Sequence, residues 1–150
     1  MKENSVIIDT NIWIYYLNKD SKFHKKSKEV ITAYIETKFD MFITSQIYRE
    51  MLVVLTSVKF LEKPLSPEAA TEKVKEILEL VTVLFETEES NNKLSELISE
   101  NQINGYKIHD ANIIAVGLQN EIESIRTNNT KDFPESNGIK VHGLNKNAKQ

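Results

Sequence analysis

Short apolar runs alternate along this chain with longer stretches in which apolar residues recur every three or four positions. The short runs are rich in β-branched residues, which is typical of buried strands, whereas the longer stretches have the spacing of amphipathic helices. We expect strands at residues 6–8, 41–45, 81–85, 124–127 and 139–142. We expect helices near residues 11–17, 23–37, 46–60, 67–80, 88–101 and from about 109 onward. This alternation predicts an α/β fold in which helices flank a central parallel sheet of about five strands.

The composition fits one globular domain of ordinary size. The chain has 150 residues, 40% of them hydrophobic and 27% charged, and this length buries a core without cross-links. It contains no cysteine, which excludes disulfides, thiolate metal ligands and thiol nucleophiles. No apolar run is long enough to span a membrane and the N-terminus lacks a signal-peptide core, so we expect a cytoplasmic protein with no membrane partner. We place the domain at residues 1–144 and expect residues 145–150 to form a disordered tail.

The first expected strand ends on a carboxylate. The run 6–8 leads directly into Asp9, Thr10 and Asn11, after which the apolar pattern resumes. The carboxyl ends of parallel strands are where α/β sheets collect ligands, so Asp9 is a candidate site residue. Taken alone, Asp9 also has a simpler interpretation, because Asp often caps the helix that follows a strand.

Two further acids interrupt apolar helix faces. Glu50 lies between Val53 and Val54 on a helical wheel, so its carboxylate borders the apolar stripe of its helix. Asp110 lies on the inward side of a helix that is apolar almost all round. A salt bridge is the alternative interpretation of Glu50, and the favourable field at a helix start is the alternative for Asp110. A buried carboxylate is costly unless it is paired, protonated or bound to a metal.

The predicted topology brings these acids to one edge of the sheet. Asp9 and Thr127 end strands at that edge, and Glu50 and Asp110 enter it from helices. Two carboxylates about 4 Å apart repel by about 4 kcal/mol at an effective dielectric of about 20, so a cluster of them needs a counter-charge. Oxygen ligands, with no Cys and only three scattered His, predict Mg²⁺ or Mn²⁺ rather than zinc.

Four motifs together resemble the PIN-domain nucleases, and most closely the VapC-like ribonuclease toxins of toxin-antitoxin pairs. They are Ile8-Asp9-Thr10-Asn11, Glu50 in the helix after the second strand, His109-Asp110-Ala111 at the start of an apolar helix, and residues 127–133 after the fourth strand. Each motif is weak alone, whereas four in this order and spacing are fairly specific, and the match runs from about residue 5 to residue 142. The chain departs from common members in a longer, more charged middle, residues 59–72.

The resemblance implies an acidic pocket that holds Mg²⁺ or Mn²⁺ and hydrolyses RNA internally, leaving 5′-phosphate and 3′-hydroxyl ends. It also implies a homodimer and a cognate antitoxin protein that inserts a basic or apolar segment into the cleft. The implied catalytic residues and metal ligands at matching positions are Asp9, Glu50 and Asp110. The implied supporting polar groups are Thr10, Asn11, Thr127 and Asn129.

The fourth acid of the site is the one that the sequence determines least. The matching loop can place an acid at the position of Asn129, so we expect the remaining charge to come from Asp132 as a further metal ligand. Phe133 can anchor this loop in the core and hold the neighbouring carboxylate near the strand ends. The alternative is that Asp132 is an ordinary turn residue before Pro134. We assign no catalytic role to His109.

The densest basic cluster precedes and enters the second expected helix, at Lys22, Lys25, Lys26 and Lys28. A solvated helix face is its commoner explanation, and a surface that follows phosphates is the sharper one. The net charge of −3 argues against a general electrostatic grip on nucleic acid, so a local basic patch would have to supply it. We take Lys22, Lys25, Lys26 and Arg49 as candidate substrate contacts.

Other classes of protein share parts of this pattern. Phosphotransfer enzymes and receiver domains also place Asp at strand ends, but haloacid-dehalogenase-type phosphatases need a second Asp two positions later, where this chain has Asn11. A non-catalytic nucleic-acid or partner-binding module on the same fold is disfavoured by the intact acids. Within the nucleases, a flap-type DNA nuclease or an RNA-processing factor without an antitoxin stays open, because no residue is seen to read the 2′-hydroxyl.

Overall fold

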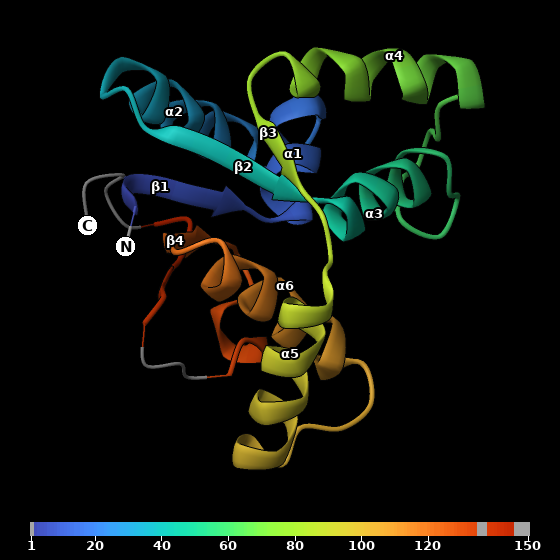
Figure 1. The fold of residues 1–150 in the computed structure, drawn as a ribbon. Coiled ribbons are helices and arrows are strands. Elements are labelled where there is room, and N and C mark those ends of the chain that lie inside the picture. The colour runs from blue at the N-terminus through green and yellow to red at the C-terminus, as the bar shows by residue number, and fades with distance from the viewer. Residues whose placement is uncertain (1, 135–137, 146–150) are drawn as a thin grey trace.

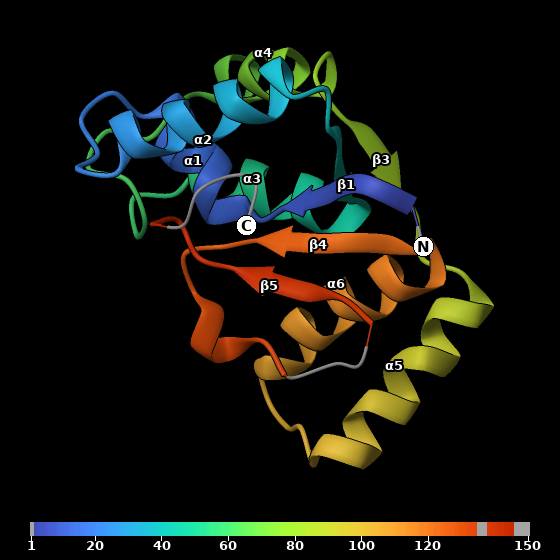
Figure 2. The same cartoon turned by 90° about the vertical axis from the view of Figure 1, so that its left-hand side faces the viewer.

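The sheet has five parallel strands in the order β3-β2-β1-β4-β5, of which Figure 1 labels β1 to β4 and Figure 2 labels β5 beside β4. In this computed structural model, residues 2–134 and 138–145 are described. The strands are β1 (Lys2–Ile8), β2 (Asp40–Thr44), β3 (Thr82–Leu84), β4 (Ile122–Arg126) and β5 (Lys140–His142). The predicted α/β fold with a five-stranded parallel sheet is therefore confirmed. The expected tail, residues 145–150, lies outside the described residues except for Asn145.

Helices cover both faces of this sheet. They are α1 (Thr10–Leu17), α2 (His24–Glu36), α3 (Ser45–Leu55), α4 (Pro67–Leu78), α5 (Glu88–Asn101) and α6 (Lys107–Gln119), with a short 3₁₀ turn η1 (Thr130–Asp132). Figure 2 shows α1, α2 and α4 on one side of the strands and α5 and α6 on the other. Within the described ranges, no helix is both long and apolar enough to cross a bilayer.

Four boundaries differ from those predicted. The strand β1 begins four residues earlier than expected, because Lys2 already pairs with Ile122. The helix α3 begins at Ser45, one residue earlier than expected, because the preceding Thr44 is its cap and accepts from the Ile47 N–H through its hydroxyl. The same helix ends at residue 55 instead of about 60, and α6 starts two residues before its expected position.

The strand order reverses at β1. The chain runs from β1 to β2 and β3 on one side and then returns to β4 on the other side. Figure 2 shows β1, β4 and β5 ending at the same edge. Ligands of open α/β sheets bind outside the carboxyl ends of the strands at such a switch point. The residues that follow β1 and β4, Asp9 and Thr127, are therefore in the place where a site is expected.

The helix α6 lies unusually close to the sheet. A Cβ added at Gly117 would come within 2.7 Å of Ile139 Cδ1 and 3.1 Å of Ile7 Cδ1, so only glycine fits there without a shift of its neighbours. Almost all of the middle of α6 is buried, as its apolar sequence predicts. The first turn of α6, with Asp110, is held by this packing near the carboxyl ends of the strands.

Arg126 fixes the end of β4 from inside the core. This fully buried side chain donates from Nε to the Tyr34 hydroxyl at 2.9 Å and from Nη1 to the Gly143 carbonyl at 2.7 Å. These bonds join α2 and the segment after β5 to β4. They hold the residue that follows, Thr127, at a defined place at the edge of the sheet.

Candidate active site

Asp9 is held by three neighbours at the end of β1. Its Oδ1 accepts from the Thr10 N–H at 2.8 Å, and its Oδ2 accepts from the Thr127 hydroxyl at 2.7 Å and from Asn11 Nδ2 at 3.4 Å. Asp9 is also the cap of α1, so the simpler interpretation of this residue holds together with the functional one. Asp9 is only 6% exposed, and these hydrogen bonds fix its oxygens relative to the ends of β1 and β4.

The supporting polar residues form one network across the switch point. Asn11 donates to the Thr127 hydroxyl at 3.2 Å, and its Oδ1 accepts from the Asn128 N–H at 3.0 Å. The N–H of Asn129 also donates to the Thr127 hydroxyl, at 3.1 Å. The network joins the start of α1 to the loop after β4, which orients the side chain of Asp9.

Three of the four predicted acids line a single pocket of about 350 Å³. Asp9 comes from the end of β1, Glu50 from α3 and Asp110 from the first turn of α6. Asp132 does not line the pocket and is exposed in η1, although Phe133 beside it is buried as predicted.

Burial and mutual repulsion change the proton affinity of this cluster. Burial raises the pKa of Asp9 to about 6, against the lowering effect of its hydrogen bonds, and the charge of Glu50 adds to the rise. The pKa of Asp110 is raised to about 7. Burial is the largest cause, and the charges of Asp9, Asp132 and Glu50 are the further causes. Asp132 therefore acts electrostatically on the cluster from outside the pocket. A cation among these acids would relieve the repulsion.

The chemistry of the donors fits a hard divalent cation. The charged side chains that line the pocket are all carboxylates, and the uncharged ones include the Asn11 and Asn129 amides. Oxygen donors of this kind suit Mg²⁺ or Mn²⁺. Within residues 2–134 and 138–145, no group of three or more His, Cys, Asp or Glu side chains already has the arrangement of metal ligands.

A residue that the sequence analysis missed links α3 to α6 beside the acids. Gln46 is buried on α3 one turn before Glu50, and its Oε1 accepts from Asn112 Nδ2 of α6 at 2.9 Å. Asn112 also donates to Glu86 Oε1, at 2.9 Å. The available signal was a polar side chain one helical turn before Glu50, on the same side of the helix.

The pocket is not lined by any of the four candidate substrate contacts, Lys22, Lys25, Lys26 and Arg49. Lys22 lies over the ring of Phe23, 5.0 Å from its centroid. Lys26 pairs with Glu29 at 4.0 Å, which is the solvated-face arrangement. Their contact with substrate stays a prediction.

The chain is an α/β domain with three acids at the switch point of a parallel sheet. The family model of the PIN domain matches residues 6–137. The chain belongs to the PIN-domain family.

Solved structures share this fold at low sequence identity. A chain of DNA-bound VapBC from Salmonella typhimurium is 19% identical, with a TM-score of 0.69, covering 93% of this chain and 98% of that one. A toxin-antitoxin complex from Klebsiella pneumoniae is 18% identical, with a TM-score of 0.61 and coverage of 89% and 94%. VapC20 from Mycobacterium tuberculosis, a toxin that cleaves the sarcin-ricin loop, is 17% identical, with a TM-score of 0.59 and coverage of 80% and 86%. A comparison with curated protein sequences found no match.

Proposed function

We propose that this protein is a metal-dependent endoribonuclease and the toxin of a toxin-antitoxin pair. The observation that carries the proposal is that Asp9, Glu50 and Asp110, from three separate elements, line one pocket at the switch point of a PIN domain. PIN-domain nucleases generally use divalent metal ions. Burial, and after it neighbouring negative charge, raises the pKa values of Asp9 and Asp110, and a bound cation would stabilise their charged forms.

In this mechanism Asp9, Glu50 and Asp110 would hold Mg²⁺ or Mn²⁺, and Asp132, which lies outside the pocket, would be a peripheral ligand. When bound, such an ion would activate water and stabilise negative charge on the leaving oxygen. Thr10, Asn11 and Thr127 orient Asp9, and Asn129 holds the Thr127 hydroxyl. Without a cation, Asp110 is partly protonated near neutral pH, because burial, and after it the charges of Asp9, Asp132 and Glu50, raise its pKa to about 7.

RNA is the proposed substrate. The VapC20 toxin that shares this fold cleaves the sarcin-ricin loop, which supports RNA as the class of substrate. The test uses single-stranded RNA and DNA of one sequence with Mg²⁺ or Mn²⁺, and the ends of the products are mapped. We expect internal cuts in RNA that leave 5′-phosphates. Cleavage of DNA alone would move the protein to the flap-type nucleases, and cleavage of neither would leave a binding module.

The proposed partner is a cognate antitoxin that places a basic or apolar segment in the acidic pocket. Support comes from the VapBC and toxin-antitoxin structures that share the fold. The net charge of −3 makes a basic inhibitor complementary to this chain. The test is to co-express any small DNA-binding protein that is encoded beside this gene, and then to measure mass by light scattering and cleavage by the complex. We expect a homodimer that binds the partner and stops cleaving. A strict monomer without such a neighbour would favour an RNA-processing nuclease.

A further inference from the structure

The pocket that holds the acids has a second, apolar side. Ile14 and Tyr15 of α1, Val54 of α3 and Phe60 of the following loop line the same cavity as the acids. Phe60 is 54% exposed, although most large apolar side chains in the described residues are buried. A half-exposed aromatic ring beside a group of candidate catalytic carboxylates is a surface on which a planar apolar group can be buried.

The turn that carries Phe60 is fixed by its own hydrogen bonds. The N–H of Phe60 donates to the Ser57 carbonyl at 3.2 Å, as does that of Leu61 at 3.0 Å. Further along the loop, the N–H of Leu65 donates to the Leu55 carbonyl at 2.8 Å. These hydrogen bonds fix the backbone of the turn that carries Phe60.

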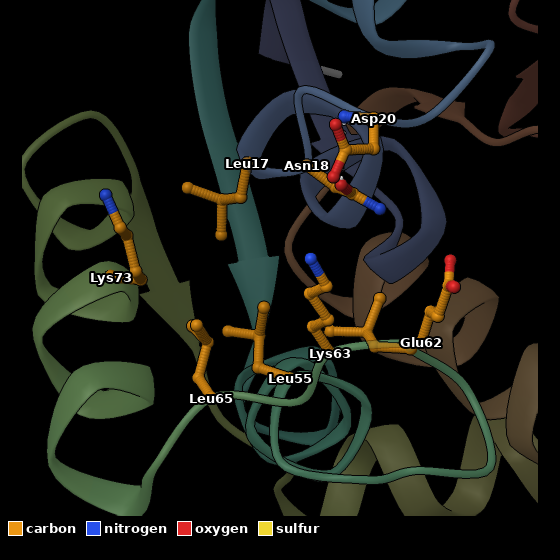
Figure 3. A pocket seen from close by; sticks show the side chains of 9 residues that line it. Leu17, Asn18, Asp20, Leu55, Glu62, Lys63, Leu65 and Lys73 are labelled. Carbon is orange, nitrogen blue, oxygen red and sulfur yellow. Dashed lines mark hydrogen bonds between the residues drawn. The ribbon is translucent and has the colours of Figure 1, made fainter.

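The same loop lines a second pocket of about 380 Å³. Figure 3 shows Lys63 and Leu65 pointing from the loop toward α1, where Leu17 lies. Phe60 lines the acid pocket and not this one, so the loop contributes side chains to two separate cavities.

The ring of Tyr15 is also fixed in place. Its hydroxyl accepts from Asn128 Nδ2 at 3.2 Å, and its ring lies 4.7 Å from that of Phe23. Asn128 belongs to the loop whose neighbouring residues hold Asp9. One side of the apolar surface is thus connected to the polar network of the candidate active site.

A cation accompanies the exposed ring. Lys59 Nζ lies 5.5 Å from the centroid of Phe60. An aromatic ring next to a cation matches a nucleotide, which offers a flat base and a negative phosphate. It matches an apolar peptide less well, because such a segment has no negative group for Lys59.

We propose that Phe60, supported by Tyr15 and Val54, is a stacking platform for a nucleobase next to the scissile phosphate of single-stranded RNA. The inference rests on the proposed ribonuclease function and adds a substrate subsite to it. A base inside a duplex is stacked on its neighbours and cannot reach the ring, so the platform selects unpaired RNA. Lys59 contacts a phosphate of the same nucleotide or its neighbour, which counters the repulsion between RNA and the acids.

The test measures binding of fluorescently labelled, random-sequence RNA of about ten nucleotides by polarisation, with chelator present so that no cutting occurs. We expect Phe60→Leu to weaken binding of single strands about tenfold, and Phe60→Trp to bind at least as tightly as the parent. The indole introduced by Phe60→Trp should lose fluorescence when RNA stacks on it. Val58→Ala is the matched control, since Val58 lies in the same turn, is 82% exposed and does not line the pocket.

The outcomes separate this inference from the proposed function. Binding by Phe60→Leu that equals the parent's, an equal loss in Val58→Ala, or an equal loss for duplex RNA would overturn the platform. Absence of any RNA binding by the parent would overturn it as well. If Phe60→Leu does not fold, the fluorescence of Phe60→Trp decides alone. Stacking on that indole without metal-dependent cleavage by the parent would support the platform and reject the ribonuclease.

Discussion

Gln46 donates a hydrogen bond from Nε2 to Glu50 Oε1 over 2.8 Å. The same nitrogen donates to the carbonyl of His109 at 3.1 Å, and His109 directly precedes Asp110 in α6. Gln46 is only 6% exposed, so water does not readily replace these bonds. One buried amide therefore links the Glu50 carboxylate on α3 to the backbone of α6 one residue before Asp110.

The first prediction follows from that amide. Gln46→Leu should raise the Mn²⁺ concentration needed for half-maximal RNA cleavage about tenfold, because Glu50 loses the donor that orients it. The measurement is cleavage rate against Mn²⁺ concentration. Gln119→Leu, at the far end of α6, is the matched control and should behave as the parent. An unchanged metal requirement in Gln46→Leu would show that the amide only packs the helices together.

The second prediction concerns stability without metal. The pKa of Asp110 is about 7 in the folded protein, whereas its ordinary value, which applies to the unfolded chain, is 3.8. Between these two pH values the folded state keeps a proton that the unfolded chain has released. The free energy of unfolding should therefore fall as pH rises across this window and level off above it. Asp110→Asn removes the effect and should be more stable than the parent by roughly 1–3 kcal/mol at about pH 8, but not at about pH 4.

Urea unfolding in chelator measures this difference, with the exposed Asp20→Asn as the control. A variant Asp110→Asn that is less stable than the parent at the higher pH would contradict the repulsion argument.

The sequence predicted the part of the site that interrupts a regular pattern. Asp9 ends an apolar run, and Glu50 and Asp110 disturb apolar helix faces, so each was visible without a structure. Gln46 was missed because its role depends on His109 and Asn112, which are 63 and 66 positions away. Such a contact is set by the packing of α3 on α6 and has no local signature.

Phe60 was missed for a different reason. The apolar spacing of α3 continues to Val58, which favoured a helix up to residue 60. The helix ends at Leu55. The Leu55 carbonyl accepts a hydrogen bond from the N–H of Leu65, ten positions further along the chain. This loop contact is tertiary, so periodicity alone could not place Phe60 in the turn beside the pocket.

The third prediction separates the central acids from the peripheral one. Asp132 is exposed and outside the pocket, yet its charge reaches Asp110. We expect Asp132→Asn to slow RNA cleavage and to raise the Mn²⁺ requirement, while Asp110→Asn abolishes cleavage. Rates over a Mn²⁺ titration provide the comparison. If Asp132→Asn titrates and cuts like the parent, Asp132 is a turn residue and the site has three acids.

The measurement that tests the central claim most directly is RNA cleavage by the parent and by Asp9→Asn, each with Mn²⁺ and with excess chelator. Asn can still cap α1, so the variant should fold, as thermal unfolding will show. The account predicts cleavage by the parent in Mn²⁺ only, and none by Asp9→Asn in either condition. Cleavage by the folded Asp9→Asn variant at the parent rate, or by either protein in chelator, would contradict a metal-dependent nuclease centred on this aspartate.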